Sequence, residues 1–342
     1  MLLVGDIGGT NTRLALFSDD ARELIRQAVF PSAAHRSLAA AIRVFLEDGG
    51  SAVKGRARTG HRPKIKAATF GIAGPVLNGR VKATNLPWVL DERSLARSLG
   101  LRHDQVSLIN DLLALALGAV AAKKKELHLL RGKVAPRPTG GTIVVIAAGT
   151  GLGEAALVWD GARLVPCGTE GGHSDFAPRS QVEWELREFV ARRIGGRVSC
   201  ERVLSGPGLA NIYDFFRDAG GKAMGENAEA ARAIADASDK SAAIATLGAA
   251  GKSKTCKEAL DLFGSLYGAE AGNLALKYLA VGGVFLAGNI ASALLPTLER
   301  QFAPAFLDKG RFAALLERVP VAVVKSSSIG LYGSARHAAG HV

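Results

Sequence analysis

The chain has 342 residues and a mass of 35.6 kDa, with 48% hydrophobic and 22% charged residues. This profile is that of a soluble globular protein with one large domain or two ordinary ones, and it excludes intrinsic disorder. Cys167, Cys200 and Cys256 lie far apart and form no CxxC pair, which excludes a disulfide scaffold and a cysteine-based zinc site. They indicate a reducing compartment, the cytoplasm. The apolar stretch at the start of the chain, in MLLVGDIGGT, is too short for a signal peptide.

The net charge of +12 comes from 43 basic and 31 acidic residues and raises the question of a nucleic-acid partner. Residues 51–66 carry six Lys or Arg and no acid, and residues 121–137 carry six Lys or Arg and one Glu. Neither stretch interleaves aromatic residues with its bases, as a stacking surface would. We interpret both as solvated loops, with an accessory anionic surface as the alternative. Residues 278–298 are uncharged but contain Gly, Asn and Pro, so they predict strand, loop and helix rather than a membrane span.

The first part of the chain predicts alternating strands and helices. Short apolar runs at residues 2–5 and 13–17 flank the turn DIGGTN, which is typical of a strand, a tight turn and a second strand. Ser37 then precedes an apolar stripe at helical spacing that ends at Gly49. Further along we expect a buried strand at 67–73, a short helix at 91–99 and a strand at 106–109.

The second part repeats this plan after the Pro- and Gly-rich stretch 134–141. The segment TIVVIAAGTGLGEAALVW is again strand, glycine-rich turn and strand, which predicts two similar halves that face each other. Ser180 and Glu183 form a capping-box pattern before a helix. Its apolar stripe is Val182, Leu186, Phe189, Val190 and Ile194. Residues 226–280 predict helices, and 283–287 a final strand before a Gly-Asn turn.

Three glycine-rich turns follow apolar strands, at residues 6–10, 149–153 and 282–288. Glycine at a strand end lets the backbone approach a phosphate and aim its N–H groups at it, and Thr10 and Thr150 can add hydroxyl donors. Asp6 is the acid of the first turn. A carboxylate there can hold Mg²⁺ or one of its waters, or alternatively cap the turn backbone.

Eight segments carry a resemblance: LVGDIGGTNTRLALF, TNLPWVL, LINDLLALALG, AAGTGLG, EGGHSDFAP, ERVLSGPGL, GGVFLAGNI and DKGRF. In this order, from residue 3 to residue 312, they resemble the bacterial glucokinase family, the type without the zinc motif. The resemblance implies an α/β, actin-like ATPase (ribonuclease H-like) fold with two α/β domains and a cleft between them. The small domain would comprise residues 1–120 plus about 319–342, and the large domain residues 121–318.

The resemblance also implies ATP and Mg²⁺, with Asp6 holding the Mg²⁺ through a water, and a cytoplasmic homodimer. It assigns to the nucleotide the residues Asp6, Gly8, Gly9, Thr10, Gly149, Thr150, Gly151 and, on the adenosine side, Gly283. The Cys-rich zinc motif of related sugar kinases is replaced here by residues 174–178, SDFAP, so no structural zinc is expected.

Asp111 is the candidate catalytic base. It follows an apolar strand, so its carboxylate should project at the strand's carboxyl end, where ligands bind in such sheets. There it can accept the proton of a substrate hydroxyl, a role worth about 10²–10⁴-fold in rate. Alternatively it caps the leucine-rich helix that follows. In glucokinases the Asp of this Asn-Asp pair is the base, and the resemblance gives that role to Asp111.

Glu170 and His173 flank two glycines, a spacing that lets both side chains face one polyhydroxyl ligand. On the residues alone, His173 could be an ordinary surface or core histidine and Glu201 a solvated charge. In glucokinases the matching Glu-Gly-Gly-His and Glu-Arg-Val-Leu segments contact the sugar, with the Asn of the Asn-Asp pair. The resemblance therefore makes Asn110, Glu170, His173 and Glu201 the sugar-binding residues.

The function expected from all this is ATP-dependent phosphorylation of D-glucose to glucose 6-phosphate. The alternatives are a kinase of the same fold for another hexose or amino sugar, and a sugar-sensing DNA-binding regulator. The regulator would explain the positive charge, but the first hairpin begins at residue 2 and leaves no room for an N-terminal helix-turn-helix. We therefore expect glucose and ATP as partners, and neither nucleic acid nor membrane.

Overall fold

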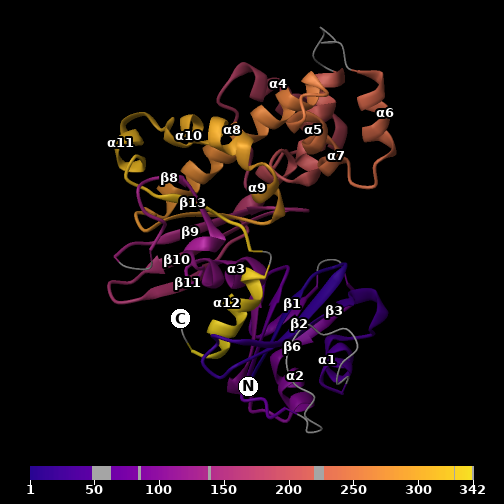
Figure 1. Ribbon diagram of the computed structural model, residues 1–342, viewed down its shortest axis with the longest axis vertical. Helices are drawn as coiled ribbons and strands as arrows, with labels where there is room; N and C mark the ends of the chain where they lie inside the picture. The colour runs from indigo at the N-terminus through magenta and orange to yellow at the C-terminus, as the bar shows by residue number, and fades with distance from the viewer. Residues whose placement is uncertain (48–62, 84–85, 138–139, 219–226, 327, 341–342) are drawn as a thin grey trace. The chain divides into compact units, whose positions relative to one another are not determined.

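The computed structural model describes residues 1–47, 63–83, 86–137, 140–218, 227–326 and 328–340 (Figure 1). Most of the basic stretch 51–66, and Gly49, lie outside the described residues. The chain divides into two compact units. The first comprises Met1–Ala122, Asp160–Gly168 and Ser326–Val342, and the second comprises Lys123–Trp159 and Thr169–Lys325.

The first sheet has five strands in the order β3-β2-β1-β4-β7. Their bounds are β1 Leu2–Ile7, β2 Asn11–Phe17, β3 Leu24–Pro31, β4 Ala67–Ile72 and β7 Val106–Asn110. Strands β1, β4 and β7 are parallel, whereas β1, β2 and β3 pair antiparallel in turn. Ile7 pairs with Ile72, and Ile72 with Asn110, so the carboxyl ends of the parallel strands meet at one edge. Strands β5 (Arg80–Lys82) and β6 (Val89–Asp91) form a separate ribbon.

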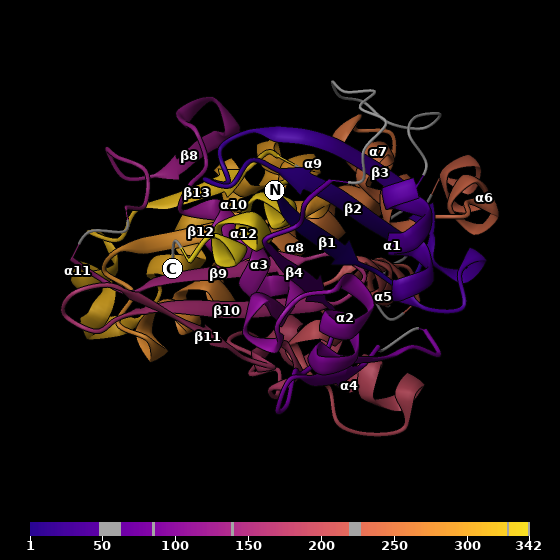
Figure 2. The same ribbon diagram turned by 90° about the horizontal axis from the view of Figure 1, so that it is seen from below.

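Helices cover both faces of this sheet, which explains why β1 and β4 are buried along nearly their whole length. The helices are α1 Leu38–Glu47, α2 Glu92–Leu99, α3 Asp111–Ala119 and α12 Ile329–Ala338. Along β1, Leu3 and Ile7 pack into the cluster of α1 and α2, and the alternate Leu2 and Val4 pack against α12. Helices α3 and α12 lie side by side (Figures 1 and 2). A Cβ at Gly333 would overlap the carbonyl oxygen of Ala114, so this close approach requires glycine.

The second sheet has six strands in the order β11-β10-β9-β12-β13-β8. Their bounds are β8 Leu127–Arg131, β9 Ile143–Ala148, β10 Leu152–Trp159, β11 Leu164–Gly168, β12 Gly283–Ala287 and β13 Val321–Val324. Strands β9, β12 and β13 are parallel, and β10 pairs antiparallel with β9. The succession β11-β10-β9-β12-β13 repeats β3-β2-β1-β4-β7 of the first sheet. The duplicated hairpin predicted from the sequence is therefore confirmed within each sheet.

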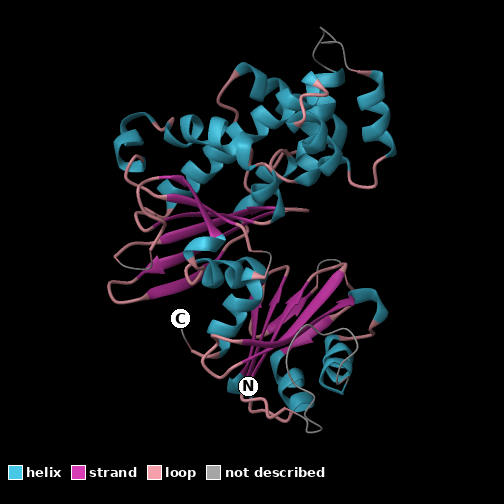
Figure 3. Cartoon of the chain, in the orientation of Figure 1, coloured by secondary structure: helices cyan, strands magenta, loops and turns pink. Residues whose placement is uncertain are grey.

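The helices of the second unit gather on one side of its strands (Figure 3). They are α4 Gln181–Ile194, α5 Gly206–Asp218, α6 Ala228–Asp236, α7 Lys240–Ala249, α8 Lys254–Lys277, α9 Asn289–Ala293, α10 Leu295–Leu307 and α11 Ala313–Leu316. The long helix α8 packs against α10, β9 and β12. Its Tyr267 hydroxyl accepts from Ala148 N–H at 3.2 Å and donates to Ile146 O at 3.3 Å, which fastens the end of β9.

Two predictions for the second unit need correction. The interpretation of 121–137 as a solvated loop is wrong at its centre, because β8 pairs antiparallel with β13. The capping box is only half formed: Ser180 Oγ accepts from Glu183 N–H, but Glu183 Oε2 accepts from Arg179 N–H at 2.7 Å. Val182 and Ile194 of the predicted stripe are 41% and 39% exposed. None of the helices in the described residues combines the length and the apolar character needed to cross a bilayer.

Candidate functional site

The first glycine-rich turn joins β1 to β2 at the carboxyl edge of the first sheet. Gly8 N–H donates to Asn11 O at 3.0 Å. Ser32, which is fully buried, holds the turn from outside: its Oγ donates to Gly8 O at 2.7 Å and its N–H to Thr10 O at 2.9 Å. These bonds fix the backbone of the turn without a contribution from the Asp6 carboxylate.

Asp6 lies one residue before the end of β1 and pairs in register with Arg13 on β2. Its Oδ2 is 3.5 Å from Arg13 Nη1, and its side chain is 38% exposed. Burial raises the pKa of Asp6, and the Arg13 guanidinium lowers that pKa in turn. Mg²⁺ takes one or two protein carboxylates and completes its shell with water and phosphate oxygens. A partly exposed carboxylate beside this turn fits that requirement better than it fits a turn cap.

Asn110 and Asp111 stand where β7 meets α3. Asn110 is the N-cap of the helix: its Oδ1 accepts from Leu112 N–H at 2.9 Å, and its Nδ2 donates to Gly74 O at 3.3 Å. Asp111 is the first helical residue, and its Oδ1 also accepts from Leu112 N–H at 2.9 Å. Both residues are half-buried. Because Asn110 caps the helix, capping alone does not account for Asp111.

Asp6 and Asp111 share the carboxyl edge of one sheet. In register, Asp6 lies beside Gly71 of β4, and Gly71 lies beside Ile109 of β7. A Cβ at Gly71 would come within 3.6 Å of Asp111 Cα. Two strand spacings separate β1 from β7, about 10 Å. The first turn and the candidate base are thus brought to one edge of the sheet.

The second glycine-rich turn joins β9 to β10 and is held differently. Gly149 N–H donates to Gly151 O at 2.8 Å, and Gly149 O accepts from Gly206 N–H at 2.8 Å. Leu152 N–H donates to Glu201 Oε2 at 3.0 Å. A Cβ at Gly151 would lie 2.5 Å from that same oxygen, whereas nothing stands within 4 Å of a Cβ at Gly149. The turn is therefore open on the Gly149 side and closed by Glu201 on the other.

Two short 3₁₀ turns that contact each other carry the three sugar candidates of the second unit. Glu170 is the N-cap of η4 (Gly171–His173), His173 ends it, and Glu201 lies in η5 (Cys200–Arg202). Glu170 and His173 are exposed, and His173 N–H donates to Glu170 O at 3.0 Å. Arg197 Nη1 donates to His173 O at 2.7 Å. Glu201 is half-buried and bound to Leu152, so it is not a merely solvated charge.

Gly283 and Gly288 lie at opposite ends of β12. Gly283 begins the strand, is buried, and has φ 125°, and its Cβ would lie 2.5 Å from Pro136 Cβ. Gly288 follows the carboxyl end, has φ 86°, and its Cβ would lie 2.9 Å from Ala148 O beside the second turn. The sequence analysis places both glycines in the predicted turn 282–288, but it assigns only Gly283 to the nucleotide. The signal was available, since Gly288 follows an apolar strand as Gly8 and Gly149 do.

The predicted residues divide between the units. The first unit holds Asp6, Gly8, Gly9, Thr10, Asn110 and Asp111, and the second holds Gly149, Thr150, Gly151, Glu170, His173, Glu201 and Gly283. Among the described residues, no three His, Cys, Asp or Glu side chains gather as a metal site. An Mg²⁺ held by one carboxylate and by the substrate's phosphates needs no such cluster.

Comparison with known proteins gives one consistent family. The family model described as Glucokinase matches residues 3–341. The chain is 38% identical to a glucokinase of Nostoc punctiforme, covering 99% of each chain. It is 37% identical to one of Escherichia coli O1:K1, covering 98% of this chain and 96% of the relative.

Solved structures agree with this result. A glucokinase from an Antarctic psychrotroph superposes with a TM-score of 0.80 at 29% identity, covering 99% of this chain and 98% of that one. A glucokinase from Balamuthia mandrillaris in complex with glucose, at 22% identity and TM-score 0.76, shares the fold. The chain therefore belongs to the glucokinase family and is a hexose kinase of the actin-like ATPase fold.

Proposed function

We propose that this enzyme transfers the γ-phosphoryl group of ATP to the 6-hydroxyl of D-glucose, with Asp111 as the general base. The observation that carries this proposal is the position of Asp111 on the same sheet edge as the first glycine-rich turn. Relatives at 37–38% identity over nearly the whole chain are named glucokinase, which supports glucose as the sugar.

In this mechanism the substrate hydroxyl lies between the Asp111 carboxylate and the terminal phosphorus. As the O6–H bond breaks, its proton passes to Asp111 and the oxygen forms a bond to phosphorus. The bond from phosphorus to the β,γ-bridging oxygen breaks, and ADP leaves. Such a transfer needs alignment and charge neutralisation more than covalent help from the protein.

The nucleotide would be held by backbone N–H groups of the two turns, Asp6–Thr10 and Gly149–Gly151, with Gly288 proposed in place of Gly283 at the end of β12. Asp6 would hold Mg²⁺ directly or through a water, and the ion would neutralise charge on the phosphates when bound. Asn110, Glu170, His173 and Glu201 are the proposed sugar contacts. Hydroxyls left unpaired in a closed site cost about 1–3 kcal/mol each, so these groups would set the sugar preference.

Replacement of the base tests the mechanism. In Asp111→Asn the amide cannot take up the proton, so kcat should fall about 10²–10⁴-fold. The Kd of glucose, measured by calorimetry, should stay within about threefold because the amide keeps the shape and the Asn110 cap remains. A kcat near that of the unaltered enzyme would remove the base assignment.

A coupled assay across glucose, mannose and glucosamine, with ATP, ADP and polyphosphate as donors, tests the substrates. We expect the highest kcat/KM with glucose and ATP. A cytoplasmic homodimer is part of the proposal, supported by the family resemblance, and sedimentation velocity tests the dimer.

A further inference from the structure

Two buried carboxyl groups of the second unit have no part in the mechanism above. Glu154 lies on β10 directly after the second glycine-rich turn and is 1% exposed, and Glu270 lies on α8 and is 8% exposed. Within the described residues, Glu154 Oε1 and Glu270 Oε1 each lack a hydrogen-bond donor. Burial and the adjacent Glu270 carboxylate raise the pKa of Glu154 to about 7. A proton on Glu154 would supply a donor in this buried site.

Glu154 lies directly against the segment that holds two of the sugar candidates. A Cβ at Gly171 would overlap Glu154 Oε2. Because glycine has no side chain, the Glu170–His173 segment can pack directly against the carboxyl group. Thr169 Oγ1 donates to the backbone oxygen of Glu154 at 3.1 Å and accepts from Gly171 N–H at 3.1 Å. The path of the chain between Glu170 and His173 is therefore set by Glu154.

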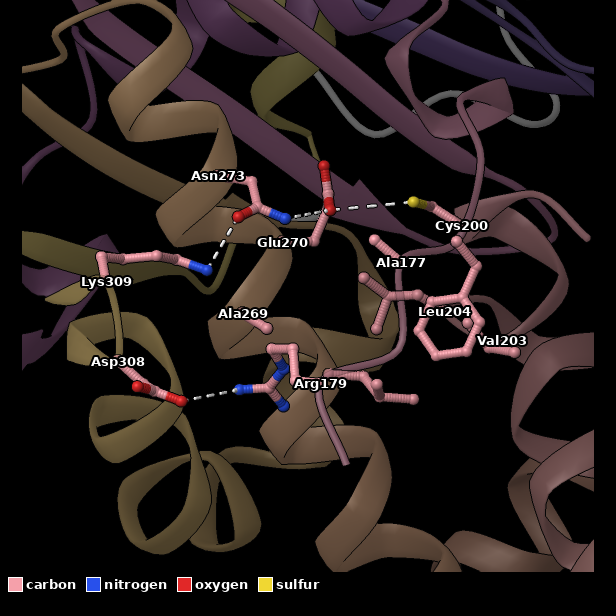
Figure 4. A pocket seen from close by; sticks show the side chains of 12 residues that line it. Ala177, Arg179, Cys200, Val203, Leu204, Ala269, Glu270, Asn273, Asp308 and Lys309 are labelled. Carbon is pink, nitrogen blue, oxygen red and sulfur yellow. Dashed lines mark hydrogen bonds and ion pairs between the residues drawn. The ribbon is translucent and has the colours of Figure 1, made fainter. Parts of the chain in front are cut away.

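Glu270 supports the other sugar candidate through Cys200, which directly precedes Glu201 (Figure 4). Glu270 Oε2 accepts from Cys200 Sγ at 3.7 Å and from Asn273 Nδ2 at 2.9 Å. Asn273 Oδ1 accepts from Lys309 Nζ at 2.7 Å. Cys200 N–H in turn donates to Ser174 O at 2.9 Å, next to His173. A cavity of about 210 Å³ borders this network, so solvent reaches it from one side.

Charged and titratable groups face the pair from each element packed on it. Lys277 of α8 lies 3.6 Å from Glu270 Oε1 and forms an ion pair with it. Cys200 of η5 and Tyr267 of α8 are buried, and burial raises the pKa of Cys200 to about 12. Lys309, after α10, reaches the pair through Asn273. The nearby lysines thus compensate the negative charge of one carboxylate at this site, but not the charge of a second one.

We propose that Glu154 and Glu270, joined by one shared proton, are positioning residues that hold the Glu170–His173 segment and Glu201 in the geometry that binds glucose. This proposal rests on the proposed function of those residues as sugar contacts. Loss of the shared proton places two negative charges side by side in a buried site, and the repulsion pushes the Gly171 segment away from β10. The affinity for glucose therefore falls as the pair loses its proton, while the nucleotide side is unaffected.

Two substitutions at Glu154 test this. Glu154→Ala removes the support of Gly171 and leaves Glu270 without its proton donor, so the KM and the calorimetric Kd of glucose should rise about tenfold. The KM of ATP and kcat should stay within about threefold. Glu154→Gln keeps the shape and donates a hydrogen bond at every pH. It should bind glucose as the unaltered enzyme does at pH 6, and should lose the rise in glucose Kd that the unaltered enzyme shows toward pH 8.5.

Glu183→Gln is the matched control, because Glu183 is another buried carboxylate of this unit, 3% exposed and bonded to Arg179. It should leave the pH dependence of glucose binding unchanged. Equal glucose Kd values for Glu154→Ala and the unaltered enzyme would overturn the proposal. So would a Glu154→Gln variant whose glucose Kd rises with pH as before, a result that stands even if the alanine variant does not fold. Failure of the unaltered enzyme to bind glucose at all would instead refute the proposed function.

Discussion

The two glycine-rich turns occupy equivalent positions in two sheets with the same strand order. They differ in where the acidic residue of each hairpin lies and in how far it is buried. In the first, Asp6 precedes the glycines, is 38% exposed and pairs with Arg13. In the second, Glu154 follows the glycines, is 1% exposed and faces Glu270. One acid is partly exposed to solvent, and the other is enclosed by protein. We therefore propose a binding role for the acid of the first hairpin and a supporting role for that of the second.

The buried acid gives the largest expected effect. A folded-state pKa of about 7 lies above the ordinary 4.5, so this group stabilises the fold fully below pH 4.5 and loses that contribution as pH rises through 7. The loss is on the order of 3 kcal/mol. Urea unfolding between pH 5 and pH 8 should therefore show a steeper fall in stability for the unaltered enzyme than for Glu154→Gln. Parallel curves would show that Glu154 does not titrate in this range.

The exposed acid should act on the metal instead of the fold. If Asp6 holds Mg²⁺ through a water, Asp6→Asn should weaken the apparent Mg²⁺ affinity about 10–100-fold in initial-rate titrations. Because burial raises the pKa of Asp6, removal of the charge should leave the unfolding temperature unchanged or higher. Asp20→Asn, in an exposed turn of the same unit, serves as the control. An unchanged Mg²⁺ requirement in Asp6→Asn would contradict the assignment.

Substitution of Gly149 and Gly151 tests whether the two sides of the second turn differ as the structure indicates. Gly151→Ala forces Glu201 away from Leu152 N–H, so the unfolding free energy should fall by about 1–2 kcal/mol and glucose binding should weaken. Gly149→Ala places its methyl group in open space, so the fold should keep its stability while the KM of ATP rises. Thermal unfolding of both variants measures this difference. Equal losses of stability would contradict the assignment of an open and a closed side of the turn.

The ion pair at the first turn gives the smallest effect. Arg13 and Asp6 are 41% and 38% exposed, so Arg13→Gln should lower stability by less than about 1 kcal/mol. Urea unfolding at low and at high salt measures this. A loss above 2 kcal/mol would mean that the first turn depends on its charges as strongly as the second depends on Glu154.

The sequence alone predicted the parts whose signal is local. Apolar runs that end in glycine predicted both hairpins, β4 and β12. The apolar run of β7, which ends at Asn110 and Asp111 instead, predicted that strand and indicated these two residues. The edge strands β3 and β8 were missed, because the half-buried segments Leu24–Pro31 and Leu127–Arg131 mix charged with apolar residues and resemble loops. The pairing of Glu154 with Glu270 could not be foreseen, since 116 positions separate them and only the packing of α8 on the second sheet joins them.

In the proposed mechanism the enzyme phosphorylates glucose and uses the nucleotide only when sugar is bound. The most direct measurement follows ADP release and glucose 6-phosphate formation together, with and without glucose, in the presence of ATP and Mg²⁺. We expect one glucose 6-phosphate for each ADP and almost no ADP release without sugar, because the acceptor hydroxyl is the group that Asp111 is proposed to deprotonate. ADP release at the same rate with and without glucose, and no sugar phosphate, would contradict it.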